Sequence, residues 1–258
     1  MFIVRTNSEH MTVTYIYHSC YLLEYESFSL LFDFYKDVQR DDGSYWIKDY
    51  LLSKPQDLYV FCTHSHDDHY NPEVLTWQSK KNNIQYIFSK ELLDSGTVYN
   101  MHNIIFLDKT EKWEDHNLEV QAFGSTDIGG SFLLTVDGRR IFHAGDLNNW
   151  HWNEEVPPAE AASYENNFLC ELELVTESLE NLCLTMFPVD PRLGKDYMRG
   201  AEQFVKRIST NYFLPMHFGE NYEQVNAFER YAKQQSCTYL KITHKGQTYK
   251  LKYYNNGD

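Results

Sequence analysis

Short hydrophobic segments, either continuous or alternating with polar residues, recur along the whole chain. Both patterns are typical of β-strands, buried on two faces or on one. They predict strands at 11–17, 19–25, 28–34, 57–63, 84–88, 104–107, 118–123, 131–136, 140–144, 183–188, 212–215, 238–243 and 247–251. The first three form a meander, and the dipeptide Asp137-Gly138 predicts a hairpin turn between two of the later strands.

Longer segments with a helical pattern separate some of these strands. They predict helices at 71–80, 159–181, 197–209 and 221–235. At the start of the first, Asn71, Pro72 and Glu73 have the residue types of an N-cap, a first-turn proline and a first-turn acid. Strands followed by helices, and then by strands and helices again, indicate two sheets between outer helical layers. We therefore expect an α/β fold in four layers, an αββα sandwich.

Composition and charge limit the classes of protein to consider. With 258 residues, 42% of them hydrophobic, the chain can bury one large core, and we expect a single domain, 1–258. The net charge of −14 argues against the basic surface that nucleic-acid binding requires. The sequence has no segment of the ~20 apolar residues that a membrane span needs, and no signal-peptide pattern. Its five cysteines form no CxxC pair, so we expect reduced thiols and a cytoplasmic protein.

Three imidazoles and two carboxylates fall within the seven residues from Thr63 to His69. Imidazole and carboxylate are ligands that suit zinc, iron and manganese. The segment lies between a predicted strand and a predicted helix, where alternation allows His64 and His66 to point the same way. Asp68 and His69 then face a neighbouring position, whereas Asp67 occupies the variable position of the motif and is left outside the site. The motif thus predicts one metal ion or two adjacent ions.

Together with four other segments, this motif resembles the metallo-β-lactamase-fold hydrolases, and more narrowly their ascorbate-6-phosphate lactonase-like branch. The matching segments are 17–20 (Tyr-His-Ser-Cys), 29–33 (ending in Asp33), 141–146 (ending in Ala-Gly-Asp) and 214–219 (Leu-Pro-Met-His-Phe-Gly). In this family the Ala-Gly-Asp aspartate commonly bridges two metals, and the histidine of the last segment ligates the second. The resemblance implies this ligand set: His64 and His66 for the first metal, Asp68, His69 and His217 for the second, and Asp146 bridging.

One departure from the family pattern concerns the first metal. Most members supply a third histidine between the motif and the bridging aspartate, but residues 122–131 contain none. Either Asp127 or a hydroxyl such as Ser125 substitutes, or the first site is weak, or only one ion binds. His143 and His151 are other candidates. His143 is expected to face away from Asp146 by strand parity and to pack or support the site.

Two further residues near the site have open alternatives. Asp33, at the end of an apolar strand, either hydrogen-bonds a ligand histidine or forms a turn. His151, between Trp150 and Trp152, either binds substrate at the mouth of a cleft or packs between exposed aromatic rings.

The expected chemistry is hydrolysis by a metal-activated hydroxide. The cofactor is one or two divalent ions, with Zn²⁺ the first expectation and Mn²⁺ or Fe²⁺ the alternatives. Asp68 and Asp146 are the expected catalytic carboxylates, and Asp68 orients the water or accepts its proton if it is not a ligand. Arg192 and Lys195, on a predicted rim loop, are expected to bind a carboxylate or phosphate of the substrate.

The expected function is that of a metal-dependent hydrolase of a small, anionic ester, lactone, amide or phosphodiester. The partner is a small-molecule substrate, with no nucleic acid and no membrane, and a homo-oligomer is left open. The alternative is a metal-bound sensor or ligand-binding module without turnover, because the first site lacks its usual third histidine.

Overall fold

The computed structural model describes residues 10–179 and 181–252, and within these residues fourteen strands form two seven-stranded sheets. The first sheet has the order β14-β1-β2-β3-β4-β5-β6, and the second has the order β13-β12-β11-β10-β9-β8-β7. The first contains β1 (His10–Tyr17), β2 (Cys20–Glu24), β3 (Phe28–Phe32), β4 (Asp57–Cys62), β5 (Ile84–Ser89), β6 (Ile104–Leu107) and β14 (Thr248–Lys252). The second contains β7 (Lys112–Glu114), β8 (Glu119–Phe123), β9 (Ser131–Val136), β10 (Arg139–His143), β11 (Asn181–Pro188), β12 (Ser209–Met216) and β13 (Thr238–Tyr239).

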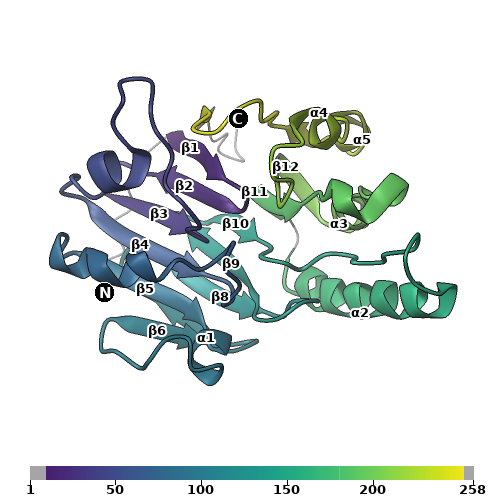
Figure 1. The fold of residues 1–258 in the computed structure, drawn as a ribbon, viewed down its shortest axis with the longest axis horizontal. Coiled ribbons are helices and arrows are strands. Elements are labelled where there is room, and N and C mark those ends of the chain that lie inside the picture. The colour runs from purple at the N-terminus through teal and green to yellow at the C-terminus, as the bar shows by residue number, and fades with distance from the viewer. Residues whose placement is uncertain (1–9, 180, 253–258) are drawn as a thin grey trace.

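Helices cover the outer face of each sheet (Figure 1). The first sheet carries the π-helical turn η1 (Trp46–Leu51), the 3₁₀ helix η2 (Pro72–Ser79) and α1 (Glu91–Asp94). The second carries α2 (Pro158–Glu177), α3 (Arg199–Arg207), α4 (Tyr222–Asn226) and α5 (Glu229–Gln234). A 3₁₀ segment, η3 (Pro191–Asp196), connects β11 to α3. The expected αββα sandwich is therefore confirmed.

Aromatic side chains fill the space between the two sheets. The ring of Phe61 on β4 lies 4.7 Å from that of Phe32 on β3 and 5.7 Å from that of Phe132 on β9. His143 on β10 stacks on Phe32 at 4.8 Å, whereas the preceding Phe142 stacks on Phe204 of α3. Successive strand residues point to opposite faces, so β10 packs against β3 on one side and α3 on the other. The packing role predicted for His143 is confirmed.

Two predicted elements differ in extent from their sequence patterns, one because it is divided and the other because it is shorter. The helix predicted at 221–235 is divided into α4 and α5, because the amides of Ala227 and Phe228 bond three residues back, to Gln224 and Val225. The strand predicted at 238–243 covers only Thr238–Tyr239. Further on, the Asn226 side chain accepts from the Ile242 amide and donates to its carbonyl, so a side chain replaces the missing strand partner.

Other differences come from elements too short to have a periodic pattern. The three-residue strand β7 and the turn η1 were not predicted, and the helix predicted at 71–80 is the 3₁₀ helix η2. Its predicted N-cap is confirmed, since the Asn71 side chain accepts a hydrogen bond from the Glu73 amide. Residue 180, inside the helix predicted at 159–181, lies outside the described residues. In the part of the chain that the structure describes, no helix is long and apolar enough to span a membrane.

Candidate metal centre

The expected ligands gather where strands of both sheets end. In the first sheet β3 and β4 run parallel, and in the second β10, β11 and β12 run parallel, so the carboxyl ends of each set share an edge. The loops that follow these ends carry most of the site, while the β1–β2 turn and the loop between β8 and β9 complete it. Two groups result: His64, His66, Asp127 and Asp146, and His18, Asp68, His69 and His217. Within each group the candidate ligand atoms all lie within 4.8 Å of one another.

Asp146 lies between the two groups. Its Oδ1 is 3.1 Å from Nε2 of His69, and its Oδ2 is 3.5 Å from Nε2 of His64 and 3.4 Å from Nε2 of His217. One carboxylate therefore faces histidines of both groups, as a bridging ligand would.

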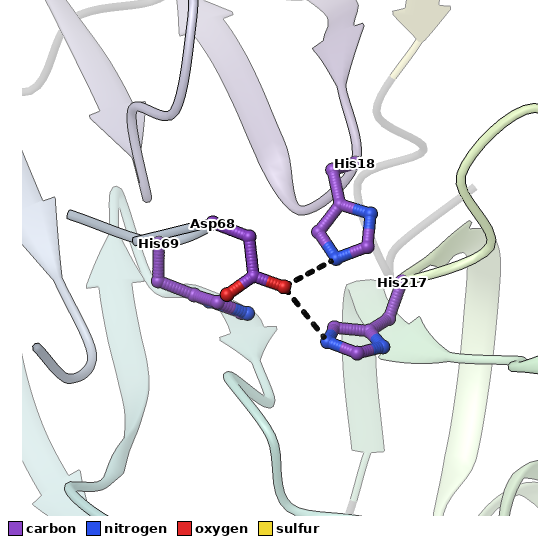
Figure 2. Close-up of side chains that lie close together, drawn as sticks. All are labelled: His18, Asp68, His69 and His217. Carbon is purple, nitrogen blue, oxygen red and sulfur yellow. Dashed lines mark ion pairs between the residues drawn. The ribbon is translucent and has the colours of Figure 1, made fainter. Parts of the chain in front are cut away.

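The second group is shown in Figure 2. Oδ2 of Asp68 is 3.1 Å from Nε2 of His18 and 3.7 Å from Nε2 of His217, so both rings point at the same oxygen. In the first group, Nδ1 of His66 lies 3.5 Å from Oδ2 of Asp127. The structure thus brings together all six residues expected as ligands and adds Asp127 and His18.

Local interactions fix the loop that carries the His-x-His-x-Asp-His motif. The amides of His69 and Tyr70 bond to the His66 carbonyl and close a tight turn. The Glu91 carboxylate accepts the amide and hydroxyl of Ser65 at 2.9 and 2.7 Å. These bonds fix the backbone from which His64 and His66 face the first group and Asp68 and His69 face the second.

Two buried carboxylates orient histidines from behind. Oδ2 of Asp33 lies 2.7 Å from Nδ1 of His69, and Asp33 also accepts the amide and hydroxyl of Thr63. Oδ2 of Asp190 lies 3.0 Å from Nδ1 of His217. With Nδ1 donating to a carboxylate, each ring directs the lone pair of Nε2 toward Asp146, a common arrangement behind metal ligands. The hydrogen bond predicted between Asp33 and a motif histidine is confirmed.

Burial and neighbouring charges shift the pKa values of several residues in the site. The adjoining carboxylates raise the pKa of His69 and of His217 against the effect of burial. Burial, and next the neighbouring His69, lower the pKa of His64 to about 3, so its imidazole is neutral. Burial alone would raise the pKa of Asp146, but His217 and His69 hold it well below its usual range. Burial alone would also raise the pKa of Asp68, but the close approach of His18, together with His69 and His217, lowers it. Both carboxylates are therefore anionic at neutral pH.

The donor atoms of these residues fit a divalent ion. Nε2 of His18, Nε2 of His69 and Oδ1 of Asp146 are buried and make no hydrogen bond within the described part of the chain. Buried polar atoms without partners are rare in folded proteins, and three in one cluster need an explanation. Imidazole lone pairs and anionic carboxylates are what zinc, iron and manganese bind.

Three residues expected to bind substrate occupy different surroundings. Arg192 lies beside the second group: its Nη2 is 3.2 Å from Nδ1 of His217 and pairs with Asp190 at 2.5 Å. Lys195 is largely exposed and lies 3.8 Å from Glu154, away from the metal-binding residues.

His151 is placed differently from either reading of the sequence. It is fully buried, with Nε2 bound to the Asp196 carbonyl and Nδ1 accepting the Asn153 amide. Of the three, the structure brings Arg192 alone to the metal-binding residues.

Sequence reasoning missed three residues at the site. His18 was noted in a matching segment but given no role, and Asp190 was passed over as part of the loop that carries Arg192. Trp150 lies with its ring 5.4 Å from that of His217, and its Nε1 donates to the Asp146 carbonyl at 2.8 Å. An aspartate directly after a buried strand was the available signal for Asp190, as it had been for Asp33.

Ser125 and Asp127 were the first two candidates to replace the missing third histidine. The other two, His143 and His151, lie against the backbone carbonyls of Ser19 and Asp196. The hydroxyl of Ser125 accepts the Asp127 amide at 3.2 Å, which holds the loop rather than a metal position. Asp127 belongs to the first group, and burial together with Asp146 raises its pKa. The geometry favours Asp127.

Comparison with known proteins extends these observations. The sequence profile of a family described as a beta-lactamase superfamily domain matches residues 12–157. No curated protein matches the sequence significantly. Among solved structures, the chain is similar to Igni18, a metallo hydrolase from Ignicoccus hospitalis, with a TM-score of 0.67, 16% identity and coverage of 95% of this chain and 100% of that one.

Two other structures have related folds. CmlA, a diiron β-hydroxylase from Streptomyces venezuelae, has a TM-score of 0.66 and 13% identity. The match covers 96% of this chain and 55% of CmlA. YhfI, a metallo-β-lactamase fold protein from Bacillus subtilis, has a TM-score of 0.61 and 13% identity. The match covers 94% of this chain and 100% of YhfI. At these identities the likeness shows a shared fold.

Proposed function

Because the chain belongs to the beta-lactamase superfamily, we propose that it is a metal-dependent hydrolase of a small, anionic ester, lactone, amide or phosphodiester. One observation carries the proposal: two groups of histidines and carboxylates share Asp146 at an edge open to solvent. The side chains of His66, Asp127 and Asp68 are 47%, 39% and 37% exposed, so a substrate can reach them. Open metal positions are the mark of catalytic rather than structural sites.

The first ion would be held by His64, His66, Asp127 and Asp146, and the second by Asp68, His69, His217 and Asp146. Zinc is our first candidate. A carboxylate in place of the usual third imidazole also suits manganese or iron, which accept harder oxygen ligands. The diiron description of CmlA, which is similar in fold, supports testing iron early.

When bound, the ions supply a hydroxide at neutral pH and polarise the oxygen of the group under attack. The residues of the chain do the rest. Asp146 lies between the two groups and fixes their relative position. Asp68, which is anionic and partly exposed, orients the attacking water or accepts its proton. Trp150 covers one side of His217 and limits the access of bulk water.

Arg192 is the reason for proposing an anionic substrate. Its side chain is 61% exposed and its guanidinium adjoins His217, so donors not used by Asp190 can reach an anionic group next to the metal. Small metabolites with a carboxylate or phosphate fit this arrangement. The net charge of −14 makes a nucleic-acid substrate a poor fit.

The first experiment is elemental analysis of protein purified without chelator. We expect about two ions per chain, and a loss of about one ion in Asp127→Asn and in His217→Ala. His244→Ala, which alters an exposed histidine, is the control. Metal-free and reloaded protein are then screened against esters, lactones, amides and phosphodiesters. Absence of metal after reconstitution with zinc, manganese or iron would overturn the proposal, and metal binding without turnover would favour the sensor.

A further inference from the structure

We infer that His18 is a ligand of the second metal ion, so that this ion is enclosed by protein while the first ion contacts the substrate. The inference rests on the proposed function, because it concerns the same metal centre. It adds an imidazole from the β1–β2 turn to a site otherwise built from the loops that follow β4, β10 and β12.

The backbone places His18 at the site under strain. The residue has φ 58°, in the left-handed region that side chains other than glycine rarely adopt. Its amide donates to the Tyr15 hydroxyl at 3.0 Å, and its carbonyl accepts the amide of His217 at 3.4 Å. His217 itself has φ 64°. Two strained turns therefore support one another at the site, and strain of this kind persists mainly where function requires a geometry.

The imidazole of His18 faces the second group directly. Its ring centre is 4.3 Å from that of His217 and 6.0 Å from that of His69, and Figure 2 shows its Nε2 directed at Asp68. Donor atoms that share one ion at 2.0–2.2 Å lie at most about 4.4 Å apart. The separations in this group, all within 4.8 Å, are close to that limit.

The alternative is that His18 only positions Asp68 by a hydrogen bond. Nε2 of His18 lies 3.1 Å from Oδ2 of Asp68, but the approach lacks hydrogen-bond geometry and the nitrogen is left buried without a partner. The same oxygen is also approached by Nε2 of His217. A cation between these three atoms satisfies all of them, whereas a single proton satisfies one pair.

The consequence is a difference between the two metal positions. The second ion would have His18, Asp68, His69, His217 and the bridging Asp146 around it, which fills four- or five-fold coordination. The first ion would have one protein ligand fewer, and two of its ligands, His66 and Asp127, are more than a third exposed, compared with Asp68 alone in the second group. We therefore place the free coordination position at the first ion. Closed sites hold metal for structure and open sites bind water and substrate. The substrate would thus bind to the first ion.

The direct test is nuclear magnetic resonance of zinc-loaded protein labelled with ¹⁵N-histidine, with each ring assigned through its own backbone amide. We expect Nε2 of His18 to have the chemical shift of a zinc-bound nitrogen, as His69 and His217 do, unlike the exposed His244. A shift typical of a free imidazole at His18, with metal-bound shifts at His69 and His217, overturns the inference and leaves the proposed function standing.

Metal titration of the metal-free protein gives a second readout. His18→Gln should lower the affinity for one of two zinc ions at least about tenfold. Asp127→Asn should lower the affinity for the other zinc ion. His244→Gln is the matched control. Unchanged zinc affinities in a folded His18→Gln variant count against His18 as a ligand. If the wild-type protein binds none of zinc, manganese and iron, the proposed function fails together with the inference.

Discussion

Oδ2 of Asp33 lies 2.7 Å from Nδ1 of His69, and both side chains are fully buried. The same carboxylate accepts two hydrogen bonds from Thr63, so it has three donors around it. In Asp33→Asn the amide group necessarily turns its own N–H toward one of these donors. We expect metal affinity to fall roughly 10–100-fold and the free energy of unfolding to fall by about 1–3 kcal/mol.

Asp67→Asn is the control, because Asp67 is exposed within the same loop. Calorimetric zinc titration and urea unfolding of both variants measure the two effects. Wild-type zinc affinity in Asp33→Asn would show that Asp33 does not orient the ligand.

Much of the fold was predictable from the sequence because its strands are buried and alternate regularly. The metal-binding motif was equally visible, since four of its donors lie within six residues. The membership of the superfamily is confirmed, whereas the lactonase-like branch, the cytoplasmic location and the oligomeric state stay predictions. What local patterns could not indicate is which distant turns meet, and the contact between the His18 and His217 turns is of that kind.

Arg192 offers a test of substrate charge. Arg192→Ala should raise the Michaelis constant for an anionic substrate about tenfold or more, because a charge-assisted hydrogen bond is worth roughly 1.5–3 kcal/mol. A neutral analogue of the same substrate should lose much less. Steady-state kinetics on the two substrates measure the difference.

Lys195→Ala is the matched control for Arg192→Ala, because both were expected on the rim loop but Lys195 faces Glu154. Its Michaelis constant should stay close to that of the wild type. Equal losses in the two variants would mean that general surface charge, and not a contact at the metal centre, attracts the substrate.

His151 shows the limit of reading function from neighbours in the sequence. Its flanking tryptophans suggested a position at a cleft mouth, yet the ring is buried and bound to backbone atoms. Trp150 is the one that reaches the site. In an irregular loop, the direction of each side chain depends on backbone angles that no periodic pattern predicts, such as φ 41° at Trp152.

Gly145 precedes Asp146 and packs too closely against Gly130 and Thr63 to leave room for a side chain. Its φ is +53°, and an added Cβ would lie 2.6 Å from the Gly130 carbonyl oxygen and 2.9 Å from Cβ of Thr63. Gly145→Ala should therefore cost roughly 2–4 kcal/mol of unfolding free energy, from the left-handed backbone and the overpacking together. Because Asp146 follows directly, metal content should fall as well.

Gly138 provides the comparison for Gly145. Its φ is +75° in the β9–β10 turn, but an added Cβ would meet nothing within 4 Å. Gly138→Ala should cost only about 1–2 kcal/mol and leave the metal content unchanged. Urea unfolding and elemental analysis compare the two variants, and equal costs would refute the packing argument.

The buried His151 predicts part of the pH dependence of stability. Burial lowers its pKa, and the neighbouring Arg199 lowers it further, against the opposing effects of Asp196 and Glu165. The unfolded chain takes up a proton on this residue as the pH falls through about 6.5. In the folded chain His151 takes up this proton only at a lower pH. The free energy of unfolding therefore decreases as the pH falls below the pKa of His151 in the unfolded chain.

His151→Gln removes this titration while keeping a donor and an acceptor. With a chelator present throughout, the free energy of unfolding should fall less between pH 7.5 and pH 5.5 in the variant than in the wild type. His244→Gln, at an exposed position, should follow the wild-type curve. Parallel curves for the wild type and His151→Gln would mean that His151 binds protons equally in both states, contrary to its burial between Asp196 and Asn153.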